Sequence, residues 1–222
     1  MDQKNFYGFN NCVIGIEASR IRSGGGKAHL VGILTAEDPM KYGISEVHLW
    51  SYQALLKTIP NRPWLFKHNP DILERSLFHQ VYWQRFQLPK VLQKTGCSIV
   101  FNTSAGTVSR FQPSVTLSQQ MLCYQPKEMW RYGISKLFFR LVLLRYLKNI
   151  SFRRSSAVIF LTKYAADSIQ KYCGQLSQIA YIPHGVGIDF KSIERKKSWP
   201  IVMKNPFSVC IFLTPMYTNI NG

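Results

Sequence analysis

The residues best suited to chemistry lie in a glycine loop near the N-terminus, residues 23–27, with the sequence SGGGK. An apolar run at 12–16 precedes the loop and predicts a buried strand, and residues 28–34 predict the start of a helix. Three consecutive glycines let the backbone turn sharply and approach a ligand without interference from a Cβ atom. The N–H groups at the start of the helix favour an anionic group there. The arrangement therefore suits the phosphates of a nucleotide or nucleotide sugar.

An ordinary turn between a strand and a helix is the competing interpretation of this loop, since glycine clusters commonly form such turns. Lys27 is followed by Ala28 rather than by Ser or Thr, so the loop is not a Walker A motif. Its glycine spacing also differs from the G-x-G-x-x-G dinucleotide fingerprint. The loop by itself leaves both interpretations open.

The elements that must position this loop follow from the alternation of short apolar runs with helical patterns. The apolar runs predict seven strands, at 12–16, 47–50, 64–67, 98–101, 115–119, 157–162 and 178–182. The helices are predicted at 28–38, at 51–57, at 72–94 with a kink or an end at Pro89, at 128–149 and at 163–173. This order indicates an α/β fold with a doubly wound, parallel, Rossmann-like sheet covered by helices on both faces.

The carboxyl ends of the strands are where such sheets bind ligands, so the polar turns there should share one rim. His184 follows the last strand, but Pro-His-Gly also forms a tight turn, and both roles stay open. Tyr124, Glu128 and Arg131 either frame an acceptor pocket or flank a helix, and the second interpretation is favoured. The other histidines lack the spacing of metal ligands and are expected to be structural or surface residues: His29, His48, His68 and His79.

Residues 140–154 combine five basic side chains with large apolar ones. One interpretation is a buried helix whose arginines extend to the surface. The other is a helix that lies at the surface of an anionic membrane. Because residues 141–147 are apolar nearly all round, the sequence favours burial of that stretch. Peripheral contact with an anionic membrane through a wider basic surface is a further expectation.

The composition describes a globular, strongly basic protein. The chain has 222 residues, of which 46% are hydrophobic and 18% charged, and a net charge of +17. This excess favours an anionic partner, whether nucleic acid, acidic lipid or a phosphorylated substrate.

Five scattered cysteines without a C-x-x-C pair favour a reducing compartment. No signal peptide is visible and no apolar stretch reaches the roughly 18 residues that span a bilayer, so a cytoplasmic protein is expected.

The domain organisation changes near residue 190. Residues 1–190 should form the Rossmann-like domain, and the basic stretch 191–206 reads as a linker between domains. Residues 207–213 predict a strong apolar strand, which would be the first strand of an incomplete C-terminal domain at 207–222.

Four segments together resemble the N-terminal half of glycosyltransferase family 4 enzymes, which are retaining transferases with the two-domain GT-B fold. The segments are 23–27, 115–124, 151–162, with its basic-then-apolar pattern, and 182–186, with the sequence IPHGV. The resemblance covers about residues 12 to 190, with a further strand at 207–213.

The resemblance implies transfer of a sugar from a nucleotide diphosphate sugar to a glycan or lipid-linked acceptor, in cell-surface polysaccharide or lipopolysaccharide synthesis. No metal or other cofactor is implied. Gly24, Gly25 and Gly26 would lie near the donor diphosphate. Gln119 and Gln120 stand where many relatives carry a histidine, and an amide orients a ligand but is no general base. The candidates for the acceptor or sugar site are Gln119, Gln120, Thr162, His184 and Gly185.

The resemblance also implies a second domain that supplies most donor contacts, and the sequence stops before it. The expectation is a truncated or frameshifted product that does not turn over a nucleotide sugar alone, and release of nucleoside diphosphate by the purified chain would contradict this. Two alternatives stay open, a non-catalytic acceptor-binding module and a basic nucleic-acid-binding protein. Calorimetric titration tests the first and salt-dependent filter binding the second. Nucleic acid is not the expected partner, since the basic residues are spread along the chain and form no recognisable motif.

Overall fold

The computed structural model describes residues 11–22, 24–36 and 38–184. The chain divides into two compact units, residues 1–185 and 186–222, and every described residue belongs to the first. The predicted linker at 191–206 and the predicted strand at 207–213 lie outside the described residues.

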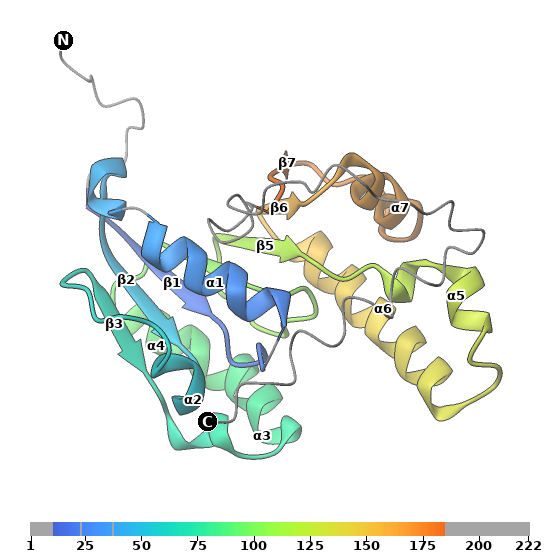
Figure 1. The fold of residues 1–222 in the computed structure, drawn as a ribbon, viewed down its shortest axis with the longest axis horizontal. Coiled ribbons are helices and arrows are strands. Elements are labelled where there is room, and N and C mark those ends of the chain that lie inside the picture. Colours follow the sequence, from blue (N-terminus) through green and yellow to red (C-terminus); the bar gives the residue numbers. More distant parts are fainter. Residues whose placement is uncertain (1–10, 23, 37, 185–222) are drawn as a thin grey trace, which may run out of the picture. The chain divides into compact units, whose positions relative to one another are not determined.

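A single seven-stranded sheet forms the centre of the first unit (Figure 1). Its strands are paired in parallel in the order β3-β2-β1-β4-β5-β6-β7. They are β1 Cys12–Glu17, β2 Ile44–Trp50, β3 Leu65–His68, β4 Ile99–Asn102, β5 Ser114–Ser118, β6 Ala157–Phe160 and β7 Ile179–Tyr181. The predicted doubly wound parallel sheet and its seven strands are thus confirmed. The order reverses between β1 and β4, the position where such sheets bind ligands.

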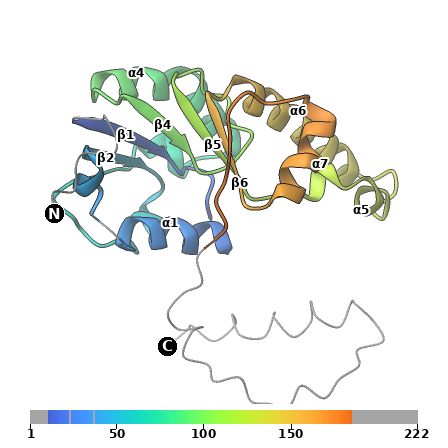
Figure 2. The ribbon, with the colours of Figure 1, turned by 90° about the horizontal axis from the view of Figure 1, so that it is seen from above.

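Helices cover the sheet on both faces. The α-helices are α1 Gly25–Ala36, α2 Gln53–Leu56, α3 Leu77–Tyr82, α4 Leu88–Lys94, α5 Pro126–Trp130, α6 Lys136–Arg154 and α7 Lys163–Cys173. The 3-10 segments are η1 Pro39–Tyr42, η2 Asp71–Glu74 and η4 Leu122–Tyr124, and the π-helical segment is η3 Trp83–Gln87. Helices α1 and α4 lie on opposite sides of the sheet (Figure 2). Helix α1 follows β1 directly, so its first turn lies beside the carboxyl ends of the strands.

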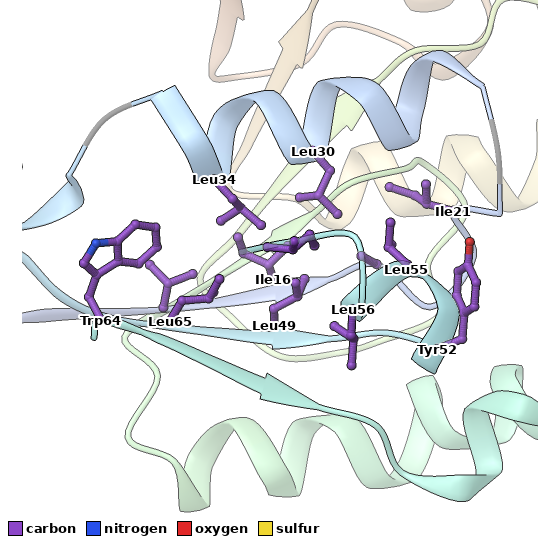
Figure 3. Packing of buried hydrophobic residues seen from close by; sticks show 13 residues of the cluster. Ile16, Ile21, Leu30, Leu34, Leu49, Tyr52, Leu55, Leu56, Trp64 and Leu65 are labelled. Atoms are coloured by element: carbon purple, nitrogen blue, oxygen red, sulfur yellow. The ribbon is translucent and has the colours of Figure 1, made fainter. Parts of the chain in front are cut away.

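Three clusters of buried apolar side chains hold these layers together. Leu30 and Leu34 of α1 pack against Ile16 and Leu49 of the sheet (Figure 3). Burial of each such leucine contributes about 1.5–3 kcal/mol. The second cluster joins η3 and α4 to the sheet and contains Trp50, Leu73, Trp83, Leu88, Leu92, Cys97 and Val100. The third joins α6 and α7 to β6 and contains, among others, Leu141, Phe152, Val158, Phe160, Ala166 and Ile169.

The prediction of a single helix over 128–149 is wrong. Helices α5 and α6 are separated by a turn in which Gly133 has a φ of +56°, a left-handed conformation that glycine adopts without strain (Figure 1). Ser135 then caps α6, accepting a hydrogen bond at Oγ from the N–H of Phe138 (3.3 Å). Helix α6 continues to Arg154, so the basic residues that begin the segment 151–162 end a helix rather than enter a strand.

The prediction that residues 141–147 are buried is also wrong for most of that stretch. Leu141 is buried, but Leu143 is 57% exposed and Tyr146 is 63% exposed. The buried face of α6 instead carries Leu141, Lys148, Ser151 and Phe152. The core therefore includes a lysine that lies just beyond the stretch predicted to be buried.

Substitution of Gly15, in β1, tests how tightly the second cluster is packed. A Cβ atom on Gly15 would lie 2.3 Å from Cδ2 of the buried Leu92 and 3.2 Å from Trp50. We expect Gly15→Ala to lower the free energy of unfolding by about 1–3 kcal/mol, because a filled core cannot take another methyl group. Gly32→Ala is the matched control, since Gly32 lies in α1 with nothing within 4 Å. It should raise stability by about 0.5–1 kcal/mol. Urea denaturation measures both, and an unchanged midpoint for Gly15→Ala would contradict this packing.

Candidate functional site

The glycine loop lies at the carboxyl end of β1, as predicted. Gly24 has a φ of +73°, in the left-handed region that favours glycine, and α1 begins at Gly25. The N–H groups of Lys27 and Ala28 donate to the carbonyl oxygen of Gly24, at 3.1 and 3.3 Å. The first N–H groups of a helix have no acceptor within the helix. The N–H groups of Gly25 and Gly26 are therefore the ones that a ligand can reach.

Gln119, which follows β5, lies against this helix terminus. A Cβ atom built on Gly26 would lie only 3.0 Å from Oε1 of Gln119, so the two residues are in close contact. The Nε2 atom of Gln119 is buried and has no hydrogen-bond partner among the described residues. An unsatisfied buried amide donor costs about 1–3 kcal/mol. A donor held at that cost beside a helix N-terminus is suited to a ligand that accepts hydrogen bonds.

His184, which follows β7, reaches the same helix. Its Nδ1 atom lies 2.8 Å from Nδ1 of His29, and the ring centroids are 4.1 Å apart. At this distance one neutral imidazole donates and the other accepts. Burial, and secondly the proximity of His184, lower the pKa of His29. The sequence did not select His29, although its position three residues after Gly26 places both on one side of α1.

The other predicted site residues divide into three cases. Gln120 is exposed, and its carbonyl oxygen accepts a hydrogen bond from Nζ of Lys148 (3.3 Å). Thr162 caps α7, with its Oγ1 accepting from the N–H of Ala165 (3.1 Å), so its hydroxyl oxygen already has a structural role. Gly185 lies outside the described residues.

Tyr124 ends η4, and Glu128 and Arg131 lie in α5 and at its C-terminus, so all three have the helix-flanking role that the sequence favoured. Tyr124 is buried and its hydroxyl donates to Oδ1 of Asn149 (2.7 Å). Burial raises the pKa of Tyr124. Glu128 and Arg131 form an exposed pair with an N–O distance of 2.9 Å. These three side chains therefore support the third cluster and α5.

The rim thus brings together backbone N–H groups, one amide and two imidazoles. These groups donate hydrogen bonds to phosphate or hydroxyl oxygens, and the helix N-terminus adds a partial positive charge. Within the described ranges, no group of three or more His, Cys, Asp or Glu residues is placed to hold a metal ion. None of the helices in those ranges is both long enough and apolar enough to cross a membrane.

Comparison with known proteins gives neither a family model nor a curated protein that matches this chain. Among solved structures, a sucrose-phosphate synthase from Thermosynechococcus elongatus has a TM-score of 0.48 and 10% identity, covering 79% of this chain and 90% of that one. HepE from Anabaena, in complex with UDP and glucose, has a TM-score of 0.46 and 16% identity, covering 81% of this chain and 46% of that one. The chain therefore spans less than half the length of HepE. At such identities no residue role can be transferred, and function has to be argued from the rim itself.

The histidine pair makes a pH-dependent contribution to stability. The pKa of His29 is lower in the folded state than its ordinary value of 6.5, so below about pH 6.5 the unfolded chain binds more protons than the folded one. Stability should therefore fall as the pH falls through this window, and His68, whose pKa burial also lowers, acts in the same direction. In His29→Gln the difference between the urea midpoints at pH 7.5 and pH 5.5 should shrink. His79→Gln, on the exposed face of α3, is the control. Equal differences in wild type and His29→Gln would refute the contribution of the pair.

Proposed function

We propose that this domain is the acceptor-side half of a glycosyltransferase that takes its sugar from a nucleotide diphosphate sugar. The observation that carries the proposal is the contact between Gly26 and Gln119 at the N-terminus of α1. It places the amide of Gln119, whose Oε1 faces Gly26 and whose buried Nε2 has no partner among the described residues, beside the backbone N–H groups on the carboxyl rim of a doubly wound sheet. Of the two interpretations of the glycine loop, a diphosphate-binding role explains this convergence better than an ordinary turn does.

The chemistry of sugar transfer makes use of such groups. The nucleoside diphosphate gains negative charge as it leaves, and preorganised N–H donors at a helix N-terminus stabilise that charge. The Gln119 amide can hydrogen-bond to a phosphate oxygen or a sugar hydroxyl, but it does not take up a proton near neutral pH. Its role is therefore to hold and orient the ligand. His184, with His29 as its partner, adds a second hydrogen-bonding group on the same side of α1.

The surface of α6 supports a lipid-linked acceptor and peripheral contact with an anionic membrane. Its exposed face carries Phe139 (62% exposed), Leu143 (57%) and Tyr146 (63%). The helix sequence contains six Lys or Arg residues, of which Lys148 alone is buried, and no Asp or Glu. Large apolar side chains between basic ones are typical of helices that lie in the interface of anionic membranes. Such a surface would bring the domain to an acceptor held in the bilayer.

Binding at the glycine loop can be followed residue by residue with NMR. On titration with UDP, GDP or ADP, the amide signals of Gly25 and Gly26 should shift, because their N–H groups would donate to the diphosphate. Gly26→Val should weaken the binding at least tenfold, since its side chain displaces the Gln119 amide. Gly32→Ala, further along α1, should leave it unchanged. The proposal fails if none of the three nucleotides shifts these two amides.

Flotation with lipid vesicles tests the α6 surface. The protein should bind vesicles that contain phosphatidylglycerol in preference to neutral ones, and Leu143→Glu should reduce the bound fraction several-fold, because it places a negative charge in the apolar face. Tyr164→Glu makes a similar change at a residue of α7 that is 67% exposed, and it should have little effect. Equal binding to neutral and anionic vesicles would remove the membrane from this proposal.

A further inference from the structure

Two cations, Arg20 and Lys148, lie near the point where the strand order reverses and are not part of the glycine loop itself. Arg20 follows β1, and Lys148 is on the inner face of α6 with an exposed fraction of only 5%. Both approach Gly106, in the segment that follows β4. The three residues therefore come from separate elements that meet at the reversal between β1 and β4.

The side chains of Arg20 and Lys148 pass the same glycine, Gly106, on their way to different carbonyl oxygens. Nη1 of Arg20 donates to the carbonyl oxygen of Gly106 at 3.1 Å. A Cβ atom built on Gly106 would lie 3.6 Å from Cγ of Lys148 and 3.8 Å from Nη1 of Arg20. Nζ of Lys148 donates to the carbonyl oxygen of Gln120 at 3.3 Å. Gly106 has a φ of +95°, so a glycine lets both long side chains pass the backbone here.

The pair has no carboxylate counter-charge in the part of the chain that the structure describes. Among the residues that the structure describes, neither Arg20 nor Lys148 forms an ion pair with a carboxylate. Burial is the main cause of the lowered pKa of Lys148; Cys123 acts in the opposite direction, and the charge of Arg20 lowers the pKa to a smaller extent. A buried cation without a partner is unfavourable, and a second cation beside it makes the site more so. Such a site becomes favourable when an anion occupies it.

Two further buried polar atoms lack hydrogen-bond partners among the described residues, one on α6 and one at the end of β4. Ser151, one turn after Lys148, is buried, and its Oγ has no hydrogen-bond partner among the described residues. Asn102, the last residue of β4, is 2% exposed, and its Oδ1 is likewise unpartnered. Its Nδ2 donates to Oγ1 of Thr116 at 3.2 Å. The interior near β4, β5 and α6 thus contains buried polar atoms, two of them without partners among the described residues.

From these observations we infer that Arg20 and Lys148 bind a phosphate group carried by the acceptor. Two cations match the charge of a phosphate monoester, which is close to −2 at neutral pH. Arg20 is only half-buried, so an anion can reach the pair from solvent. The inference rests on the proposed function, since it divides the rim in two. The donor diphosphate lies at the glycine loop, and the acceptor phosphate lies at the β1–β4 reversal.

A purely structural lysine is the competing explanation. Lys148 hydrogen-bonds to the Gln120 carbonyl oxygen and to the side chain of Cys123, so it could simply tie α6 to the segment after β5. The two roles predict opposite effects of Lys148→Met. Loss of a structural link lowers stability without phosphate, whereas removal of an unpaired buried charge leaves that stability unchanged or raises it.

Thermal unfolding of the full chain, with inorganic phosphate as the probe and sodium chloride at matched ionic strength, tests the inference. Phosphate should raise the midpoint of wild type above the chloride value. In Lys148→Met and Arg20→Gln the affinity for phosphate should fall at least tenfold. The exposed Lys171→Met, on α7, is the charge-matched control and should respond as wild type does. If Lys148→Met does not fold, the half-buried Arg20 carries the test.

Several outcomes would overturn the inference. These are an absent phosphate effect in wild type, a phosphate effect retained in Arg20→Gln or in a folded Lys148→Met, and a Lys148→Met protein that is destabilised while its phosphate response is intact. A parallel titration with UDP identifies the source of the phosphate. If Lys148→Met lowers the affinity for UDP as much as the affinity for inorganic phosphate, the pair binds the donor and the acceptor assignment is wrong. If wild type binds phosphate at this pair but UDP fails to shift the Gly25 and Gly26 amides, the proposed donor site fails while the anion site stands.

Discussion

The pairing of β1 with β2 on one side and β4 on the other fixes the whole rim. Glu17, the last residue of β1, is in register with Trp50 of β2 and Asn102 of β4. Beyond the ladders, the N–H of Ala18 donates to Trp50, and the carbonyl oxygen of Glu17 accepts from both the N–H and Oγ1 of Thr103. The chain is therefore held on both sides where it leaves β1. The glycine loop, Arg20 and the start of α1 all depend on that exit point.

The groups that hold the rim together have hydrogen-bond partners, whereas some of the groups proposed to bind a ligand lack them among the described residues. The buried carboxylate of Glu17 accepts hydrogen bonds at Oε1 from the N–H and the hydroxyl of Ser19. The Gln119 amide nitrogen, by contrast, has no hydrogen-bond partner and the Arg20–Lys148 pair no carboxylate within the described residues. Groups held in place before a ligand arrives lose little entropy on binding. The polar groups without partners among the described residues that lie at this rim are thus the ones from which we propose ligand binding.

Local patterns were enough to predict the sheet, whereas the contacts at the site depend on tertiary structure. Parallel strands are buried on both faces, so they appear in the sequence as short apolar runs, and all seven were found. The split between α5 and α6 was missed because the apolar pattern continues through Gly133. The contact between His29 and His184 joins residues 155 positions apart, and the burial of Lys148 depends on Gly106 and Gln120. No periodicity within a helix encodes either of these.

The π-helical segment η3 changes which side chains its helix turns toward the protein interior. The N–H of Leu88 bonds to the carbonyl oxygen of Trp83, five residues earlier, and this wider turn comes directly before Pro89, which has no N–H to donate. The extra residue turns the consecutive Trp83 and Gln84 inward, and Nε2 of Gln84 reaches Oγ of Ser19 at 3.2 Å. An irregularity in one helix thus brings the Gln84 side chain to Ser19, a few residues before the glycine loop. The position of Pro89 therefore bears on which side chains of this helix face the sheet.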